Sequence, residues 1–229
     1  MLNVVIAEDN VSVSVHLSNA INTKNVRCIA ILNEGTKVYQ KIKETKADIL
    51  ILDLKMPGKN GLQILRQIED DEELKTKVII YSGDTEYMKL AREYDFILKF
   101  ITKLTPYEEV SRHLQTIEDE KTNKVLENRV TDILFKLGFT YSLKGTRLIK
   151  ECILYSVQEN NENINYLYDK VAKNRGCNPL TLKSDINTAV NYMWKYTDRE
   201  KTRKILRIGE KDKPSTRTVI TMVKYYIEK

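Results

Sequence analysis

The sequence lacks the long apolar runs, paired cysteines and histidine clusters that mark several classes of protein. None of its 229 residues lies in an apolar run near the roughly 20 residues that a membrane-spanning helix needs. The first residues, Met-Leu-Asn-Val-Val-Ile-Ala-Glu-Asp, have no basic region of the kind that opens a signal peptide. The three cysteines (Cys28, Cys152 and Cys177) are far apart, which disfavours a disulfide framework or a zinc site. We therefore expect a cytoplasmic protein with no membrane segment.

The motifs of several enzyme classes are also missing. There is no Gly-x-x-x-x-Gly-Lys-Ser/Thr loop and no Gly-x-Gly-x-x-Gly run, so nucleotide binding is not supported. The second half of the chain has no carboxylate pair, no histidine–cysteine cluster and no glycine-rich loop. We therefore expect a protein that is not an enzyme.

The charge is distributed unevenly along the chain. The net charge is +6, yet residues 1–120 contain 16 lysines and arginines against 20 aspartates and glutamates, a balance of −4. The remaining residues therefore carry 22 basic and 12 acidic side chains, a balance of +10. An acidic front half and a basic back half indicate that only the back half contacts a polyanion such as nucleic acid.

The first half of the chain alternates short apolar runs with helical patterns. The runs are apolar at every position, which is typical of parallel strands buried on both faces. This pattern predicts an α/β domain over residues 1–117 with a doubly wound, five-stranded parallel sheet. The expected strands are 4–7, 28–32, 49–52, 78–81 and 100–102, and the expected helices are 10–22, 35–46, 61–68, 85–94 and 105–117.

The second half shows helical spacing only. Residues 118–128 are polar and charged with no apolar face, and we expect them to form a linker. Beyond them the apolar residues recur at helical spacing, which predicts an all-α domain over residues 129–229.

Charged and polar side chains follow the expected strands at the points where these end. Glu8 and Asp9 follow the first, Asp53 the third, Ser82 the fourth and Lys103 the fifth. In such a sheet, ligands bind at the carboxyl ends of the strands. Three clustered carboxylates repel one another and favour a hard divalent cation, above all Mg²⁺. An aspartate there can act as a nucleophile and form an acyl phosphate, whose oxygens a hydroxyl and an ammonium can hold.

The ordered set Glu-Asp, Asp-x-x-Met-Pro-x-x-Asn-Gly, Ser and Lys resembles the receiver (flavodoxin-like) domain of two-component response regulators. The resemblance covers residues 1–117. It implies that Asp53 accepts a phosphoryl group from a histidine kinase or phosphorelay protein. It also implies that Glu8, Asp9, Asp53 and the backbone carbonyl of Lys55 hold Mg²⁺. By the same resemblance, Ser82 and Phe100 are the switch residues and Lys103 pairs with the phosphate.

The sequence departs from the receiver pattern after Lys103. That lysine is usually followed by a proline with a cis peptide bond, whereas Leu104 follows it here. A cis bond before a residue other than proline costs about 2.5–4 kcal/mol, so we expect a trans peptide and a shifted Lys103. Lys99 is the alternative for the same role.

The basic half contains the pattern of a helix-turn-helix. A helix that includes Leu167 and Val171 breaks around Gly176, and Asn178-Pro179 is a good start for a second helix. The outward side of that second helix would contact bases through Thr181, Lys183, Ser184 and Asn187, because lysine can pair with guanine and asparagine with adenine. Phosphates would be held by Arg175, Lys213 and Arg217.

Residues 129–229 further resemble the effector domain of the stage 0 sporulation protein A family, the sporulation initiation regulators. The matching residues are Leu137-Gly138, Lys144-Gly145, Leu167-Tyr168, Val171-Ala172-Lys173, Ile186, Ala189-Val190, Trp194 and Lys213-Pro214. The family presents acidic and arginine side chains to DNA, whereas this chain has Lys183, Ser184 and Asn187. We therefore expect a paralogue with another target site.

Together these features predict a response regulator that is phosphorylated at Asp53, forms a homodimer and regulates transcription by binding DNA. RNA polymerase is a further candidate partner. The alternative is a phosphorylation-controlled protein-interaction module that does not bind DNA.

Overall fold

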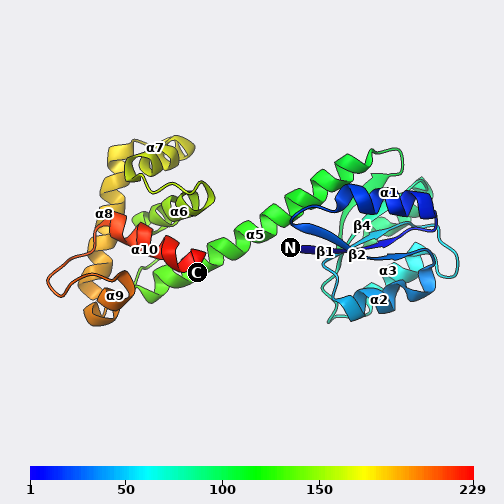
Figure 1. Ribbon diagram of the computed structural model, residues 1–229, viewed down its shortest axis with the longest axis horizontal. Coiled ribbons are helices and arrows are strands. Elements are labelled where there is room, and N and C mark those ends of the chain that lie inside the picture. The colour runs from blue at the N-terminus through cyan, green and yellow to red at the C-terminus, as the bar shows by residue number, and fades with distance from the viewer. The chain divides into compact units, whose positions relative to one another are not determined.

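The computed structural model describes all 229 residues, which form two compact units, Met1–Lys121 and Thr122–Lys229. The first unit alternates strands and helices along the chain (Figure 1). Its elements are β1 (Leu2–Ala7), α1 (Val11–Ile21), β2 (Val26–Leu32), α2 (Val38–Thr45), β3 (Ile49–Leu52), α3 (Gly61–Glu69), β4 (Lys77–Ser82), α4 (Thr85–Leu90), β5 (Ile97–Thr102) and the first turns of α5 (Tyr107–Lys136). Short 3₁₀ helices at Gly35–Lys37 and Ala91–Glu93 precede α2 and follow α4.

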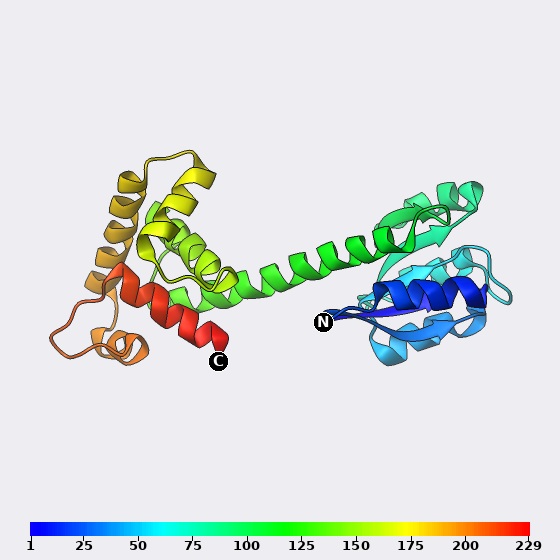
Figure 2. The same cartoon turned by 45° about the horizontal axis from the view of Figure 1, so that its top comes forward.

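The five strands form one parallel sheet in the order β2-β1-β3-β4-β5. Helices α1 and α5 cover one face and α2, α3 and α4 cover the other, as Figures 1 and 2 show for most of them. Every residue of β3 is buried, because it contributes to an apolar core on each face. The predicted doubly wound α/β fold is therefore confirmed.

Polar side chains fix where several helices begin. Asn10 accepts a hydrogen bond from the backbone N–H of Val13 at the start of α1. Asn60 and Gln63 form a reciprocal capping box at the start of α3. Asp84 accepts from two backbone N–H groups at the start of α4. These caps hold the helix starts beside the carboxyl ends of the strands.

Helix α5 is longer than the sequence pattern suggested. It continues through residues 118–128, which we expected to form a linker, and ends at Lys136. Val110 and Leu114 pack in the core of the first unit, and Val130 and Leu134 pack in the core of the second. Residues 119–125 between them are exposed. A helical segment exposed on all sides has no apolar face, so its pattern resembles that of an irregular linker.

The second unit is entirely helical, as predicted. It contains the end of α5 and the helices α6 (Lys144–Gln158), α7 (Ile164–Arg175), α8 (Pro179–Tyr196), α9 (Arg199–Leu206) and α10 (Thr216–Glu228). They enclose one apolar core to which all of them contribute. No helix in either unit is long and apolar enough to span a membrane.

The turn between α7 and α8 has the chemistry that the sequence suggested. Gly176 ends α7 in the left-handed conformation with φ of 61°, which glycine adopts without strain. Asn178 caps α8 by accepting from the N–H of Leu180, and Pro179 is the first residue of that helix. The break and the new start lie within three residues, so α7 and α8 form the predicted helix-turn-helix.

Helix α8 approaches α6 closely because of a glycine. A Cβ atom on Gly145 would lie 2.0 Å from the backbone oxygen of Asp185 on α8. The neighbouring Lys144 forms a 2.8 Å ion pair with the Asp185 carboxylate. Gly145 and Lys144 together set the position of α8 against the core.

Gly145→Ala should lower the free energy of unfolding of the helical unit by about 1–3 kcal/mol, because the helices must separate to admit the methyl group. The cost of this clash exceeds the ~1 kcal/mol by which alanine stabilises a helix interior relative to glycine. Trp194, the single tryptophan, lies on α8, so its fluorescence in a urea titration reports this unit. Gly83→Ala, where nothing lies within 4 Å, is the matched control and should leave that transition unchanged. A Gly145→Ala protein as stable as the control would contradict the close approach.

Candidate functional site

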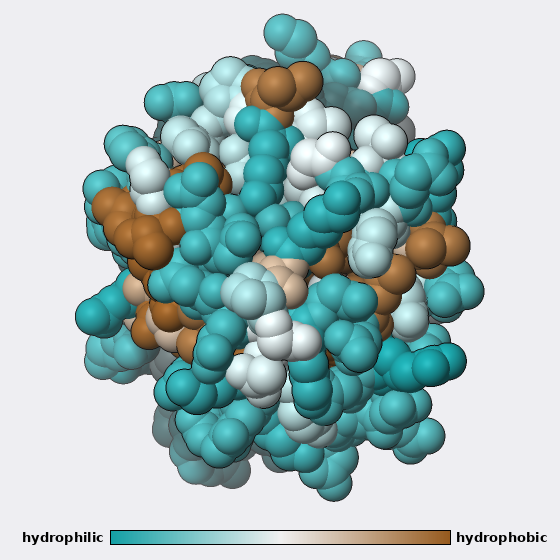
Figure 3. All heavy atoms as spheres, turned by 90° about the vertical axis from the view of Figure 1, so that its right-hand side faces the viewer, coloured by the Kyte–Doolittle hydropathy of each residue, from teal (hydrophilic) through white to brown (hydrophobic).

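Four neighbouring strands bring the expected side chains to one edge of the sheet. Glu8 and Asp9 follow β1, Asp53 follows β3, Ser82 ends β4 and Lys103 follows β5. These strands pair in parallel register, and β4 and β5 extend two residues beyond the end of β3, so their carboxyl ends meet at one edge of the sheet. Figure 3 views the first unit from the side on which the strands end, where hydrophilic side chains cover most of the surface.

Asp53 lies at the centre of this edge and is only 3% exposed. Its Oδ1 accepts a 2.7 Å hydrogen bond from the Ser82 hydroxyl and a 3.2 Å bond from the backbone N–H of Lys55. Its Oδ2 accepts a 2.6 Å bond from the Lys103 ammonium. Both carboxylate oxygens therefore face donors, which fixes their orientation toward the mouth of the site.

Lys103 bridges two buried carboxylates. Its Nζ lies 2.6 Å from Asp53 Oδ2 and 2.8 Å from Glu8 Oε1. The peptide bond to Leu104 is trans, as all peptide bonds in the chain are, and the Leu104 side chain is 94% exposed. The lysine thus reaches the site without the cis geometry expected of a following proline. Lys99 instead contacts His113 on α5, with 3.2 Å between Nζ and Nδ1.

The pKa values of two ionisable groups in the site are raised, each for a different reason. Burial raises the pKa of the Glu8 carboxyl above its ordinary value, and Lys103 offsets only part of this effect. Burial also opposes the charged form of Lys103. The carboxylates of Asp53 and Glu8 outweigh that effect and raise the pKa of its ammonium. Lys103 is therefore held in its charged form, whereas the charge on Glu8 is incompletely compensated.

The carboxylates that carry this uncompensated charge form the donor set of a divalent cation site. Glu8, Asp9 and Asp53 each offer a carboxylate oxygen, and these oxygens lie within 4.8 Å of one another. Glu8 Oε2 is buried without a hydrogen-bond partner. A buried carboxylate oxygen is costly when it is unpaired, and a hard cation with retained waters would satisfy it. The three residues therefore fit Mg²⁺.

Asp84 is a further residue of this site that the sequence pattern did not indicate. Its carboxylate pairs with the Lys55 ammonium at 2.6 Å, and its backbone N–H donates to the Ser82 hydroxyl at 3.3 Å. The side chains of Asp84 and Lys55 line an open cavity of about 320 Å³, which Asp53 and Lys103 also line. The available signal was an aspartate two residues after the strand that ends in Ser82. Because that aspartate also fits a helix cap, the pattern did not distinguish the two roles.

Phe100 lies away from these groups. It occupies the middle of β5 opposite Ile80 and packs, half-buried, against the core that α2, α3 and α4 cover. It shares β5 with the loop that carries Lys103, so a shift of that strand would move both residues.

The expected nucleic-acid contacts lie on the second unit. Thr181, Lys183, Ser184 and Asn187 are all exposed on α8, while Leu182 and Ile186 on the opposite side enter the core. The Asn187 side chain accepts a 3.0 Å hydrogen bond from Thr216 of α10. The exposed side of α8 therefore presents small polar and cationic groups, and one of them, the Asn187 side chain, is hydrogen-bonded to α10.

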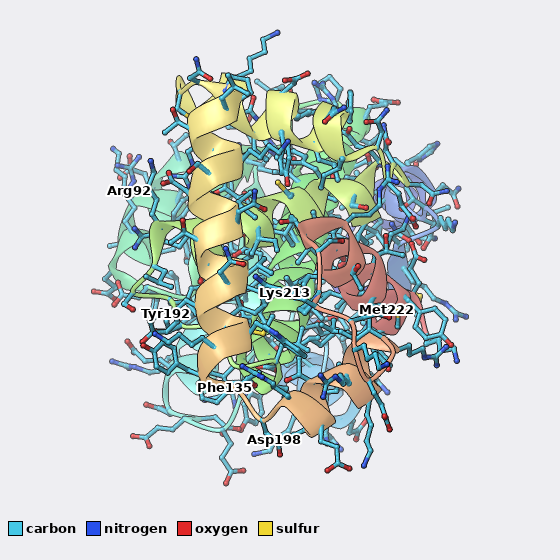
Figure 4. The ribbon with its side chains drawn as sticks, turned by 90° about the vertical axis from the view of Figure 1, so that its left-hand side faces the viewer. Arg92, Phe135, Tyr192, Asp198, Lys213 and Met222 are labelled. Carbon is cyan, nitrogen blue, oxygen red and sulfur yellow. The ribbon has the colours of Figure 1, made fainter.

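The three residues expected to contact phosphates differ in whether they are exposed or already paired. Lys213 and Arg217 are exposed, and Figure 4 shows Lys213 beside α8 on the side where α10 lies. Arg175 pairs with Glu151 of α6 through two nitrogens of its guanidinium, one of them at 3.1 Å. Arg175 would have to leave this pair to contact a phosphate, so its visible role is to join α7 to α6.

Glu8→Gln should stabilise the first unit at neutral pH in the presence of a chelator. The raised pKa means that the folded unit favours the neutral form of Glu8. The stability that neutral Glu8 contributes is therefore complete below about pH 4.5 and is lost as the pH rises through the raised pKa. Glutamine is neutral at every pH and can still accept from Lys103. The advantage of the variant should therefore grow from pH 4.5 to 8 in urea unfolding followed by circular dichroism.

Glu34→Gln is the control for this titration. Glu34 is exposed and paired with Lys37, and such pairs are screened by solvent. Its difference from the parent protein should change little with pH. A Glu8→Gln protein that is less stable than the parent across the whole range would contradict the uncompensated charge.

Comparison with known proteins assigns each unit to a family. Residues 4–115 match the response regulator receiver domain, and residues 130–227 match the sporulation initiation factor Spo0A C-terminal domain. The chain is 34% identical over 90 residues to the oxygen regulatory protein NreC of Staphylococcus aureus. That match covers 38% of this chain and 42% of NreC, so the chain spans less than half the length of this relative.

Solved structures resemble the chain over about half its length. A DNA-binding response regulator of the LuxR family from Staphylococcus aureus is 25% identical, with 52% of this chain and 99% of that chain covered and a TM-score of 0.47. The response regulator domain of Thermotoga maritima CheB is 21% identical, with 52% and 95% covered and a TM-score of 0.45. The two family matches together account for both units, and the chain is a response regulator of the Spo0A family, with a receiver domain followed by a Spo0A-type C-terminal domain.

Proposed function

We propose that the chain is a transcription factor controlled by phosphorylation of Asp53, with a histidine kinase or phosphotransfer protein as donor. The observation that carries this proposal is the environment of Asp53. A buried carboxylate faces a hydroxyl donor (Ser82), an ammonium (Lys103) and an incompletely compensated acidic pair (Glu8 and Asp9). A carboxylate kept only for stability would not need two further carboxylates beside it.

The chemistry of the transfer follows from these groups. An Asp53 oxygen attacks the phosphorus of a phosphohistidine, so a P–O bond forms while the P–N bond breaks and the imidazole leaves with the electron pair. The Lys103 ammonium and the Ser82 hydroxyl, which now donate to Asp53, would donate to the new phosphoryl oxygens. Mg²⁺ bound by Glu8, Asp9, Asp53 and the Lys55 carbonyl would supply the positive charge that brings the phosphoryl group to this acidic edge.

The same contacts offer a route from phosphorylation to a change of surface. Moving Ser82 toward a phosphoryl group would withdraw it from the N–H of Asp84, the residue that caps α4. Phe100 on the adjacent strand would follow the shift of β5. The altered face, roughly residues 85–117, would then favour a homodimer by a shift of population.

The second unit would bind DNA through the exposed side of α8. An 18-residue helix with small polar side chains at its start suits the major groove, and Lys213 and Arg217 beside it suit phosphates. A homodimer would engage repeated half-sites, and RNA polymerase would be the partner through which binding alters transcription.

The chain would act on a regulon other than that of the sporulation regulator itself. The resemblance to that family implies acidic and arginine side chains on this helix, whereas the chain has Lys183, Ser184 and Asn187. Because bases are distinguished by donors and acceptors, this change predicts a different target site.

Phosphate uptake tests the receiver site directly. Incubation of the full chain with acetyl phosphate and Mg²⁺ should add one phosphoryl group, seen as a mass increase in intact-protein mass spectrometry. Asp53→Asn should abolish it, because an amide is not a nucleophile of this kind, and chelation of Mg²⁺ should do the same. Asp95→Asn changes an exposed aspartate away from the site and should leave uptake intact. Undiminished uptake by Asp53→Asn would show that another residue is the acceptor.

Salt dependence tests the DNA interface. If about six phosphates are neutralised, the logarithm of the association constant should fall with the logarithm of salt concentration with a slope near −5. Arg217→Gln should make this slope shallower by about 1. Lys24→Gln, at an exposed site in the receiver unit, should leave it unchanged. If the phosphorylated chain bound no DNA even at low salt, a module that binds only proteins would be favoured instead.

A further inference from the structure

Asn187 lies on the side of α8 that faces DNA in the proposed function, yet the oxygen of its side-chain amide already accepts a hydrogen bond. Its Oδ1 accepts a 3.0 Å hydrogen bond from the Thr216 hydroxyl. Asn187 itself is exposed, whereas Thr216 is only 6% exposed. The amide oxygen therefore points back into the protein, and the amide nitrogen is the part left toward the outside.

The Thr216 hydroxyl is held firmly. Thr216 is the first residue of α10, directly after Ser215, whose side chain caps the helix by accepting from the N–H of Thr218. A buried side chain at the capped start of α10 thus lies behind Asn187.

This arrangement limits what Asn187 can recognise. A free asparagine pairs with adenine in the major groove through two bonds, donating to N7 and accepting from the N6 amino group. Because Oδ1 accepts from the buried Thr216 hydroxyl, it is turned toward α10, and Asn187 presents the two hydrogens of its amide nitrogen on the outer side. Guanine offers two adjacent acceptors, N7 and O6, at the same edge, so a group that only donates favours guanine over adenine.

We propose that Asn187 recognises guanine and that Thr216 is the positioning residue that gives it this preference. The proposal rests on the proposed DNA binding and deepens it. It replaces our expectation that asparagine in this helix pairs with adenine.

The surroundings of Asn187 favour the same base. Lys183, one turn earlier on the exposed side of α8, can only donate. The acidic side chain of that segment, Asp185, pairs with Lys144 of α6 and is turned from the exposed side. The exposed side therefore lacks a carboxylate that could accept from the amino groups of adenine or cytosine. Such a surface of hydrogen-bond donors complements a target strand rich in guanine, whose major-groove edge carries two acceptors.

The test uses the full chain treated with acetyl phosphate and Mg²⁺. Duplexes with a randomised centre are selected on the parent protein and sequenced, and binding to single-base variants of the selected site is then measured. The position contacted by Asn187 is the one at which base preference disappears in Asn187→Ala. We expect guanine at that position, and we expect 7-deazaguanine there to weaken binding by the parent protein but not by Asn187→Ala.

Thr216→Val removes the hydroxyl while keeping the shape of the side chain. It frees the amide oxygen of Asn187, so the preference for guanine over adenine at that position should fall about tenfold, the scale of one good base contact. Thr216→Ser keeps the hydroxyl and should retain the preference. Thr221→Val, on the same helix but away from Asn187, is the matched control. In the Asn187→Ala background, Thr216→Val should have no further effect on base preference.

The outcomes separate the two proposals. If the parent protein selects no sequence, both fail. If it selects a discrete site whose Asn187-dependent position is adenine, or if Thr216→Val leaves the guanine preference intact, the positioning role fails while the proposed function stands. Fluorescence of Trp194 during unfolding shows whether each variant keeps its fold, and loss of fold in Thr216→Val would transfer the test to Thr216→Ser against Thr216→Ala.

Discussion

The contact of the Lys103 ammonium with Asp53 and Glu8 is the interaction on which the receiver site depends. Parallel register places the end of β1 next to that of β3, with β4 between β3 and β5, so the carboxylates of Glu8 and Asp53 are held close to each other at one edge of the sheet. One ammonium shared by two buried carboxylates leaves negative charge in excess, and burial, the main cause, raises the pKa of Glu8. A site with this imbalance gains when it binds a cation, and in the proposed function Lys103 would then contact the phosphoryl group.

The site is connected to one helix more directly than to the others. Ser82 donates to Asp53 and accepts from the backbone of Asp84, which caps α4 and pairs with Lys55 from the loop after Asp53. A change at Asp53 therefore reaches the start of α4 through two independent contacts. Helix α4 is short, six residues, and has a single buried apolar side chain, Met88, so few contacts oppose its movement. A phosphorylation event would act on a short helix with one buried side chain.

In the helical unit, contacts from neighbouring helices hold α8 in place. Gly145 lets α6 approach its backbone, Lys144 pairs with Asp185, and Thr216 binds Asn187. Each contact comes from the inner or flanking side of α8, so the outer side stays exposed. A helix that recognises bases must have fixed side-chain positions, because the difference between two bases is a pattern of donors and acceptors a few ångströms apart.

The sequence by itself determined the α/β order, the helical second half and the strand ends that carry Glu8, Asp53, Ser82 and Lys103. Short runs that are apolar on both faces have one simple solution, a parallel sheet covered on each side, and its topology brings its carboxyl ends together. Tertiary structure alone decided the rest. Residues 119–125 are helical although exposed, because α5 is packed into a core at each end. The partner of Asn187 lies 29 residues away on another helix, and that of Lys55 lies 29 residues away beyond a strand. No periodicity records such pairs, because a side-chain hydrogen bond depends on where two helices cross or two loops meet, and the folded backbone sets that position.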